Sequence, residues 1–399
     1  MPEMNRRNFL IASVGAIGVV SGVAVTVPML LDHAQDRPLA ADKGVLVIVT
    51  LYGGNDGINT VIPYADNAYH DARPELSFSP GEVLDIDGHL GLNPALDGLN
   101  DLWHSKELAI VRGVGYPKQD RSHFRSMDIW QTAVPDHPVR TGWIGRWLDA
   151  SGDDPLRAIN IGPVLPPMAV GEKHLAASLS PSIPLIPNNM ASALSALSRS
   201  DAHDTAAMES VRSTYRTHQV TDHALNQFAA AAPPPDAQTD PGKQLADDLE
   251  LVARCIRARV PTQVYMVDLG GFDTHADERG DHQRLLQSLD KALTPFLRQM
   301  RTNPYGRNVT VMVYSEFGRR VRANASQGTD HGSSAPVFIA GSKVKGGFYG
   351  DEPSLTDLVD GDLKTTTDFR DVYYELLTKS IGTDPEPVVG AGRHGIGFL

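Results

Sequence analysis

Residues 44–54 read GVLVIVTLYGG, a continuous run of apolar residues that ends in two glycines. A strand that is buried on both faces of a parallel sheet has this composition, because neither of its faces meets solvent. Glycines directly after such a strand allow a tight loop in backbone conformations that other residues avoid. The stretch therefore predicts a central strand of a covered sheet, with a loop of special geometry at its carboxyl end.

The same strand pattern recurs along the chain, and helix patterns lie between the repeats. Further strands are expected over residues 108–115, 263–271, 308–318 and 335–341. Apolar residues spaced by three or four predict amphipathic helices over 244–259, 282–300 and 366–377, the second of them with Pro295 inside it. Strands that alternate with helices predict an α/β fold, a three-layer α/β/α sandwich with a mainly parallel sheet.

The chain divides into an N-terminal segment, residues 1–41, and one large domain, residues 44–399. Strand patterning is weak in the middle of that domain, which predicts a helical insertion over 151–240. The insertion ends in a low-complexity, Pro-rich stretch, AAAAPPPDAQTDPGK at 229–243, which is typical of an exposed loop.

The N-terminal segment resembles a twin-arginine export signal, which carries folded proteins across the bacterial inner membrane. Arg6 and Arg7 precede NFL, and an apolar run rich in Gly, Ala and Val follows. A permanent membrane anchor is the alternative, since residues 9–31 are long enough to span a bilayer. We expect a periplasmic or secreted protein that meets the twin-arginine export machinery and keeps no stable membrane span after processing. The single cysteine, Cys255, excludes internal disulfides, which a protein that folds before export does not need.

The charge of the chain bears on its partners. The formal net charge is -12, the sequence pI is about 5.6, and no long Lys/Arg run occurs. Binding to nucleic acid requires a concentrated basic surface, so we expect no nucleic-acid partner.

Polar residues gather directly after the predicted strands. The clusters lie at residues 53–60, 120–124, 271–275, 315–319 and 328–332. Because ligands of such sheets bind beyond the carboxyl ends of the strands, we expect these clusters to form one site. Carboxylate with imidazole is a ligand set for a divalent cation.

Each cluster also has a structural alternative that the sequence leaves open. These alternatives are a local hydrogen bond between Asp273 and His275, a turn at Asp56, a surface ion pair of Glu316 with Arg319, and a helix N-cap at Ser122.

A set of motifs in fixed order, beyond any single cluster, resembles a known family. RRNFL, LYGGNDGINTVIPY, RSHFRSMDIWQTA, GWIGRWLD, GGFDTH, SEFGR and GTDHGSSAPVFIAG together resemble the bacterial domain-of-unknown-function family 1501. The resemblance runs from about residue 44 to the C-terminus, and many members of that family carry twin-arginine signals. The family is grouped by fold with the alkaline phosphatases and sulfatases. This grouping implies an alkaline-phosphatase-like fold, one or two divalent metals bound by Asp and His, and a hydroxyl or modified cysteine that attacks phosphorus or sulfur.

The resemblance implies roles for individual residues. The metal ligands would come from Asp56, Asp273, His275, Glu316, Asp330 and His331. Ser122 would be the nucleophile, at a helix start that favours an anionic group, and Arg121 or Arg319 would hold the anion. For the neighbours in the last motif we favour His331 as the ligand, with Asp330 as its partner or a second ligand.

Two departures from the superfamily pattern concern the metal site. The Asp273-x-His275 spacing is shorter than the superfamily's Asp-x-x-x-His, and Phe317 stands where a histidine normally follows the carboxylate of the fourth strand. The second departure removes one imidazole from the expected set and puts a two-metal site in doubt.

The sequence therefore favours an exported hydrolase of small phosphate or sulfate esters that depends on a divalent metal (Zn, Mn, Ca or Mg). The alternative is a catalytically degenerate envelope protein that keeps the fold to bind a ligand or partner. Formylglycine sulfatase chemistry is disfavoured, because no C/S-x-P-x-R loop is present and Cys255 lies in a predicted helix, where we expect it to pack. A Ser-His-Asp hydrolase is disfavoured by the absence of G-x-S-x-G.

Overall fold

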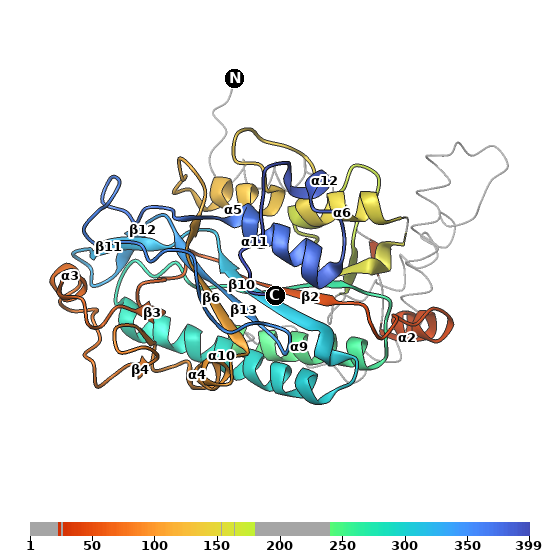
Figure 1. Cartoon of the computed structure of the whole chain (residues 1–399), viewed down its shortest axis with the longest axis horizontal. Coiled ribbons are helices and arrows are strands. Elements are labelled where there is room, and N and C mark those ends of the chain that lie inside the picture. Colours follow the sequence, from red (N-terminus) through yellow and green to blue (C-terminus); the bar gives the residue numbers. More distant parts are fainter. Residues whose placement is uncertain (1–22, 25–26, 153, 163, 180–239) are drawn as a thin grey trace, which may run out of the picture.

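A computed structural model of the chain describes all residues except 1–22, 25–26, 153, 163 and 180–239 (Figure 1). Its centre is a ten-stranded mixed sheet. The strands in spatial order are β1 (Val23–Ala24), β8 (Ala177–Leu179), β7 (Ala158–Ile161), β9 (Val264–Leu269), β2 (Val45–Leu51), β10 (Val309–Ser315), β13 (Ala335–Ala340), β6 (Leu108–Gly115) and β14 (Gly347–Tyr349), with β15 (Thr367–Asp368) also paired to β6. β13 is antiparallel to both of its neighbours, and the other pairs are parallel.

Helices cover both faces of this sheet, as Figure 1 shows. One layer holds α2 (Val27–Asp36), α4 (Asp97–His104), α9 (Pro241–Arg257), α10 (Glu278–Thr302) and the short helix η4 (Gly306–Asn308). The other layer holds α5 (His123–Thr132), α6 (Trp143–Ser151), α11 (Phe369–Glu375), the π-helical turn η5 (Leu376–Ile381) and α12 (Glu386–Val389). A separate apolar core fills each side of the sheet, which confirms the predicted three-layer α/β/α sandwich.

The strands predicted at 44–54, 108–115, 263–271, 308–318 and 335–341 are all present, shortened at most by a few residues. The amphipathic helices are present too. Pro295 lies inside α10 without ending it, and Cys255 is buried in α9, as its packing role requires.

Small elements flank the carboxyl ends of the central strands. They are the sheet of β3 (Val61–Ile62), β4 (Leu84–Asp85) and β5 (Gly91–Leu92), helix α3 (Asn67–Ala72), and the hairpin of β11 (Arg319–Ala323) with β12 (Thr329–His331). The short helix η1 (Pro155–Arg157) lies beside β7 and β8, and the short helix η2 (Pro167–Ala169) packs against α5 and α6. The hairpin carries two of the predicted polar clusters back over the edge of the sheet.

The glycines after β2 adopt the geometry that the sequence predicts. Gly53 has φ +118°, and a Cβ there would lie 2.5 Å from the backbone nitrogen of Asp273. Gly328 permits an equally close approach, because its Cβ would lie 2.3 Å from the carbonyl carbon of His275. These contacts bring the loops after β2, β9 and β11 together.

Parts of the predicted domain organisation fall on residues that the structure leaves undescribed. Within the predicted insertion 151–240, the described residues up to 179 add β7 and β8 to the main sheet, and residues 180–239 lie outside the described part. Arg6, Arg7 and the rest of residues 1–22 also lie outside it. Helix α2 falls inside the predicted signal segment 1–41, and it buries Leu30 and Ala34 in the core.

No helix in the described part of the chain is both long enough and apolar enough to cross a membrane.

Candidate metal and catalytic site

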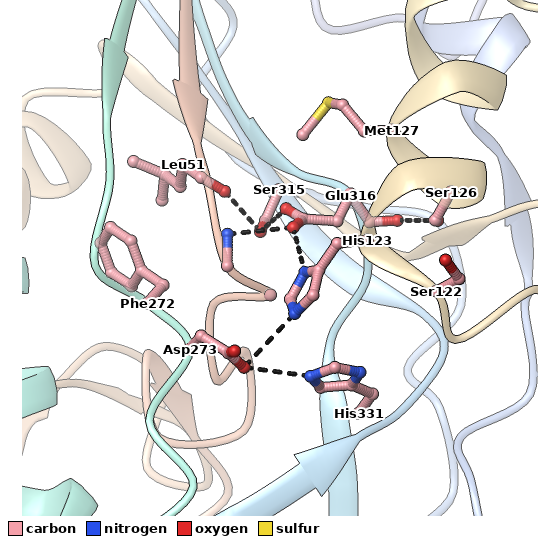
Figure 2. Close-up of polar contacts among 12 residues, drawn as sticks. Leu51, Ser122, His123, Ser126, Met127, Phe272, Asp273, Ser315, Glu316 and His331 are labelled. Carbon is pink, nitrogen blue, oxygen red and sulfur yellow. Dashed lines mark hydrogen bonds and ion pairs between the residues drawn. The ribbon is translucent and has the colours of Figure 1, made fainter. Parts of the chain in front are cut away.

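Three imidazoles converge on one carboxylate oxygen at the carboxyl edge of the sheet. The Nε2 atoms of His275, His331 and His123 lie 2.9, 3.0 and 3.4 Å from Oδ1 of Asp273. The Nε2 atoms of His275 and His331 are 3.0 Å apart. Figure 2 shows His123 and His331 pointing at Asp273 from different sides. These four residues form what we call the histidine cluster.

Each member of the cluster is positioned by the end of a secondary-structure element. His123 is the first residue of α5, and His331 is the last residue of β12. Asp273 and His275 lie in the loop that follows β9. Three segments that are far apart in the sequence therefore supply the four side chains.

A backbone contact fixes the tautomer of His331. Its Nδ1 lies 2.8 Å from the carbonyl oxygen of Arg121. A carbonyl oxygen only accepts hydrogen bonds, so Nδ1 carries a proton, and Nε2 is the ring nitrogen that faces the cluster. This arrangement is typical of an imidazole that binds a metal through Nε2.

His123 is oriented in the same way by a buried carboxylate. Its Nδ1 lies 2.8 Å from Oε1 of Glu316, a residue that is only 1% exposed. Glu316 is itself held in place, because it accepts hydrogen bonds from the backbone N–H of Gly53 and the hydroxyl of Ser315. The hydrogen bond to Glu316 raises the pKa of the His123 imidazole, although partial burial opposes it. Nε2 of His123 is buried and has no hydrogen-bond partner in the described structure.

The central carboxylate, Asp273, stays ionised. Partial burial would raise its pKa, but the hydrogen bond from His331 and the neighbouring Arg319 guanidinium lower it to about 2. Arg319 is buried and donates to this carboxylate at 2.8 Å. Its other hydrogen bonds go to the carbonyl oxygens of Gly53, Gly54, Phe272 and Thr329. Arg319 thus fastens the three loops of the site to one another.

The histidine cluster fits a divalent cation. Three imidazole nitrogens and one carboxylate oxygen are a ligand set for zinc and similar ions, and the Nδ1 partners leave Nε2 free in two of the rings. Two facing Nε2 atoms at 3.0 Å need a proton or a cation between them, because two lone pairs repel. Nε2 of His123, buried without a hydrogen-bond partner in the described structure, is a further nitrogen that could bind a cation beside Asp273. The ligand atoms of His123, Asp273 and His331 all lie within 4.8 Å of one another, the spacing of a metal site. His275 is not part of this group of three and contacts it through Asp273 and His331.

Asp330 does not take the predicted position beside His331. Consecutive residues of a strand point to opposite faces, and Asp330 is exposed on β12. Its Oδ1 accepts from Asn324 and lies 3.7 Å from Nδ1 of His275. The structure therefore corrects the prediction: Asp330 accompanies His275, and the partner of His331 is the Arg121 carbonyl.

Asp56 is the predicted metal ligand that the structure places elsewhere. It is fully buried and pairs with the buried Arg73 at 2.5 Å. Arg73 also donates to the carbonyl oxygens of Arg320 and Val321 in β11. The predicted ligand is thus a structural ion pair under the hairpin, because a cation of the chain already compensates its charge.

Glu278 and His282 surround Asp56 and make a second group with metal-ligand spacing. Burial, and then the charge of Asp56, raise the pKa of Glu278 to about 9, so at neutral pH Glu278 holds a proton. Burial also lowers the pKa of His282 to about 4. Arg73 compensates the charge of Asp56 in this group, while Oδ1 of Asp56 and Oε1 of Glu278 are buried without a hydrogen-bond partner in the described structure.

The predicted catalytic residues are only partly assembled. Ser122 is the exposed N-cap residue of α5, and its hydroxyl makes no capping hydrogen bond. Figure 2 shows it beside the cluster without a contact to the imidazoles. Arg121 donates through Nε to Asp362 at 2.7 Å, and Arg319 is committed to the loops. The predicted grip of Arg121 or Arg319 on an anion is therefore not formed.

His123 is a candidate ligand that the sequence did not predict. It stands next to Ser122 in RSHFR, and the motif pattern gives it no role of its own. Position 317 is a phenylalanine where the superfamily has a histidine. In space His123 supplies an imidazole close to that position, since it hydrogen-bonds to Glu316, the residue before Phe317. Glu278 and His282 were missed as well, although their i, i+4 spacing on a helix places them on one face.

Comparison with known proteins places the chain in a family. The family described as "Protein of unknown function (DUF1501)" matches residues 168–393, more than half of the chain. No curated protein matches the chain in sequence.

Several solved structures share the arrangement of the fold. An alkaline phosphatase superfamily protein from Vibrio parahaemolyticus is 11% identical, with a TM-score of 0.44 over 91% of this chain and 77% of that one. Murine ectonucleotide pyrophosphatase/phosphodiesterase 5 is 10% identical, with a TM-score of 0.41 over 88% and 98%. The lipoteichoic acid synthase LtaP from Listeria monocytogenes is 10% identical, with a TM-score of 0.39 over 93% and 80%. These values describe a distant likeness in fold, and no shared residue follows from them.

Proposed function

Because the chain belongs to DUF1501, a family whose description names no reaction, we propose a function from the geometry of its site: metal-dependent hydrolysis of phosphate or sulfate esters. The observation that carries the proposal is the convergence of three Nε2 atoms on Oδ1 of Asp273. An imidazole-rich set suits Zn²⁺ or Mn²⁺ better than Mg²⁺ or Ca²⁺, which prefer oxygen ligands.

A divalent cation bound there would polarise an ester oxygen and stabilise the charge that develops on it. The side chains of the cluster hold that position. Glu316 and the Arg121 carbonyl orient two of the rings, and Arg319 keeps Asp273 in place. The anionic ester would therefore bind at the exposed side of the histidine cluster.

We assign the nucleophile to Ser122. Its hydroxyl is exposed and is not used to cap α5, and the unpaired N–H groups at the start of a helix favour an anion there. Its oxygen would attack phosphorus or sulfur, the alcohol would leave, and water would hydrolyse the resulting serine ester.

The test is turnover by the metal-loaded protein over a panel of phosphate and sulfate esters. We expect at least one ester class to be hydrolysed, with activity lost on chelation and in Ser122→Ala. Equal activity in the wild type and in His331→Ala, or no turnover by fully metal-loaded protein, would refute the proposal.

A second function is favoured by one observation. Ser122 contacts no general base in the described structure, which suits a catalytically degenerate envelope protein that binds a ligand without turning it over. A stoichiometric ligand in the natively purified protein, together with wild-type ligand content in Ser122→Ala, would support this function.

Export belongs to the same proposal. The sequence RRNFL, residues 6–10, supports transport of the folded protein to the periplasm or medium by the twin-arginine machinery. Replacing Arg6 and Arg7 by lysine is expected to retain the protein in the cytoplasm. Unchanged export of that variant would contradict a twin-arginine route.

A further inference from the structure

A cavity opens beside the carboxyl ends of β7, β9 and β2, the edge of the sheet that also carries the histidine cluster. It has a volume of about 270 Å³ and lies between β7, β9, β2 and the residues around η2. Its lining includes Thr50, Tyr52, Asn160, Leu165, Met168 and Asp268. We call it the Asp268 pocket.

Asp268 is out of place for its strand. It is the one charged residue in the four adjacent parallel strands β7, β9, β2 and β10. Asp268 is exposed, whereas all the remaining residues of β9, VYMVDL, are buried. Its carboxylate lies at the wall of the pocket near the carboxyl end of β9, and a charge in an otherwise apolar, buried strand is a conflict between local sequence and fold that is expected at functional sites.

The negative charge of Asp268 is not compensated within the described residues, where it forms no ion pair with Lys, Arg or His. The charge of Asp268 also acts on a second carboxylate, that of Asp248. After burial, Asp268 is the main cause that raises the pKa of Asp248 to about 7. Burial raises the pKa of Asp268 as well. A positively charged ligand group would relieve both effects.

The rest of the lining suits an organic cation. Tyr52 adds an aromatic ring to the lining, a residue type that attracts cations, and Leu165 and Met168 offer apolar contacts for a carbon chain. The Asn160 amide nitrogen donates to the carbonyl oxygens of Gly162 and Val164, which leaves its side-chain oxygen as an acceptor. The pocket is therefore rich in acceptors.

Tyr52 connects the pocket to the histidine cluster. Burial, followed by the charge of Asp268, raises the pKa of its phenol to about 12, and Glu316 contributes in the same direction. The next residue, Gly53, donates its backbone N–H to Glu316. A substrate bound at the cluster could thus extend along the sheet edge past Tyr52.

We propose that the Asp268 pocket binds a protonated amine in the organic part of the substrate, with Asp268 as its counter-ion. This inference rests on the proposed function for the identity of the ligand as an ester substrate. The substrate class would be amine-bearing phosphate or sulfate esters.

The test is a binding comparison that does not depend on catalysis. Butylammonium and 1-butanol have similar size and shape, and they differ in charge. Titrated into the metal-loaded full chain and followed by ligand-observed NMR, butylammonium is expected to bind about tenfold more tightly, as a charge-assisted hydrogen bond provides. Asp268→Asn is expected to abolish that preference, and His331→Ala to keep it.

Further variants separate the outcomes. Leu165→Trp fills the pocket and is expected to block both probes; it replaces Asp268→Asn in the comparison if that variant does not fold. Equal affinities of the two probes for the wild type, or an unchanged preference in folded Asp268→Asn, would overturn the inference. Retained butylammonium binding in a protein without turnover would leave the pocket assigned and refute the hydrolase alone.

Discussion

Glu316 accepts a hydrogen bond from Nδ1 of His123 at 2.8 Å, across 193 residues of sequence. The contact joins the end of β10 to the start of α5, and it turns Nε2 of His123 toward Asp273 (Figure 2). A buried carboxylate on one ring nitrogen and an open position on the other is the arrangement that prepares an imidazole for a cation.

Glu316→Gln tests that preparation. The amide keeps the size of the side chain but loses the charge that makes His123 a stronger ligand, so we expect metal affinity to fall roughly 10- to 100-fold. Competition with a chromogenic chelator measures the affinity. Glu352→Gln, at an exposed carboxylate paired with Arg112, is the matched control and should leave it unchanged. Equal affinities of both variants would show that Glu316 does not support the site.

Glu278→Gln tests the buried proton. The pKa of Glu278 is raised to about 9, above the ordinary value of 4.5. Between these values the unfolded chain releases a proton that the folded chain keeps, so Glu278 makes stability fall as pH rises. Glutamine resembles the protonated acid but does not titrate. In Glu278→Gln the unfolding free energy should therefore depend less on pH, by an amount that corresponds to at most one proton. Denaturant unfolding from pH 5 to 8 measures the slope, and identical slopes would exclude a protonated Glu278.

Arg73→Met tests the role of Asp56. Removing one partner leaves a buried charge without compensation, so we expect the free energy of unfolding to fall by about 3–5 kcal/mol. The double variant Asp56→Asn/Arg73→Met should recover part of that loss. Chemical denaturation gives both values. Because Asp56 lies outside the histidine cluster, Asp56→Asn should bind as much metal as the wild type. Loss of metal from folded Asp56→Asn would show that Asp56 is a metal ligand after all.

Ser122→Ala separates a catalytic role from a capping role. A serine that caps a helix contributes about 1 kcal/mol, but the Ser122 hydroxyl makes no capping bond. We therefore expect the variant to change the unfolding free energy by less than about 0.5 kcal/mol, while hydrolysis is lost. A large fall in Tm would show that the hydroxyl has a structural role instead.

The sequence was sufficient for the fold because the apolar strands and amphipathic helices are long and strongly periodic. It also predicted that Asp273, His275, Glu316 and His331 lie close together, since strand order fixes where these loops meet. Glu316, predicted as a metal ligand, orients His123 instead. Asp56 was misplaced because its partner Arg73 belongs to a flanking helix cap that periodicity does not position. His123 was missed because its role depends on Glu316, which lies far away in the sequence.

The pairing of Asp330 shows the limit of local reasoning. Adjacent residues were expected to cooperate, yet strand geometry sends Asp330 toward His275 and His331 toward the Arg121 carbonyl. Such second contacts are set by tertiary packing. They become visible only when the hairpin of β11 and β12 is placed over the loop after β9.

Elemental analysis of the natively exported protein, compared with His275→Ala and His331→Ala, tests the central claim most directly. We predict a divalent transition metal bound stoichiometrically to the wild type and lost from both variants while they remain folded. Metal content that is unchanged in both folded variants would contradict a metal site at the histidine cluster.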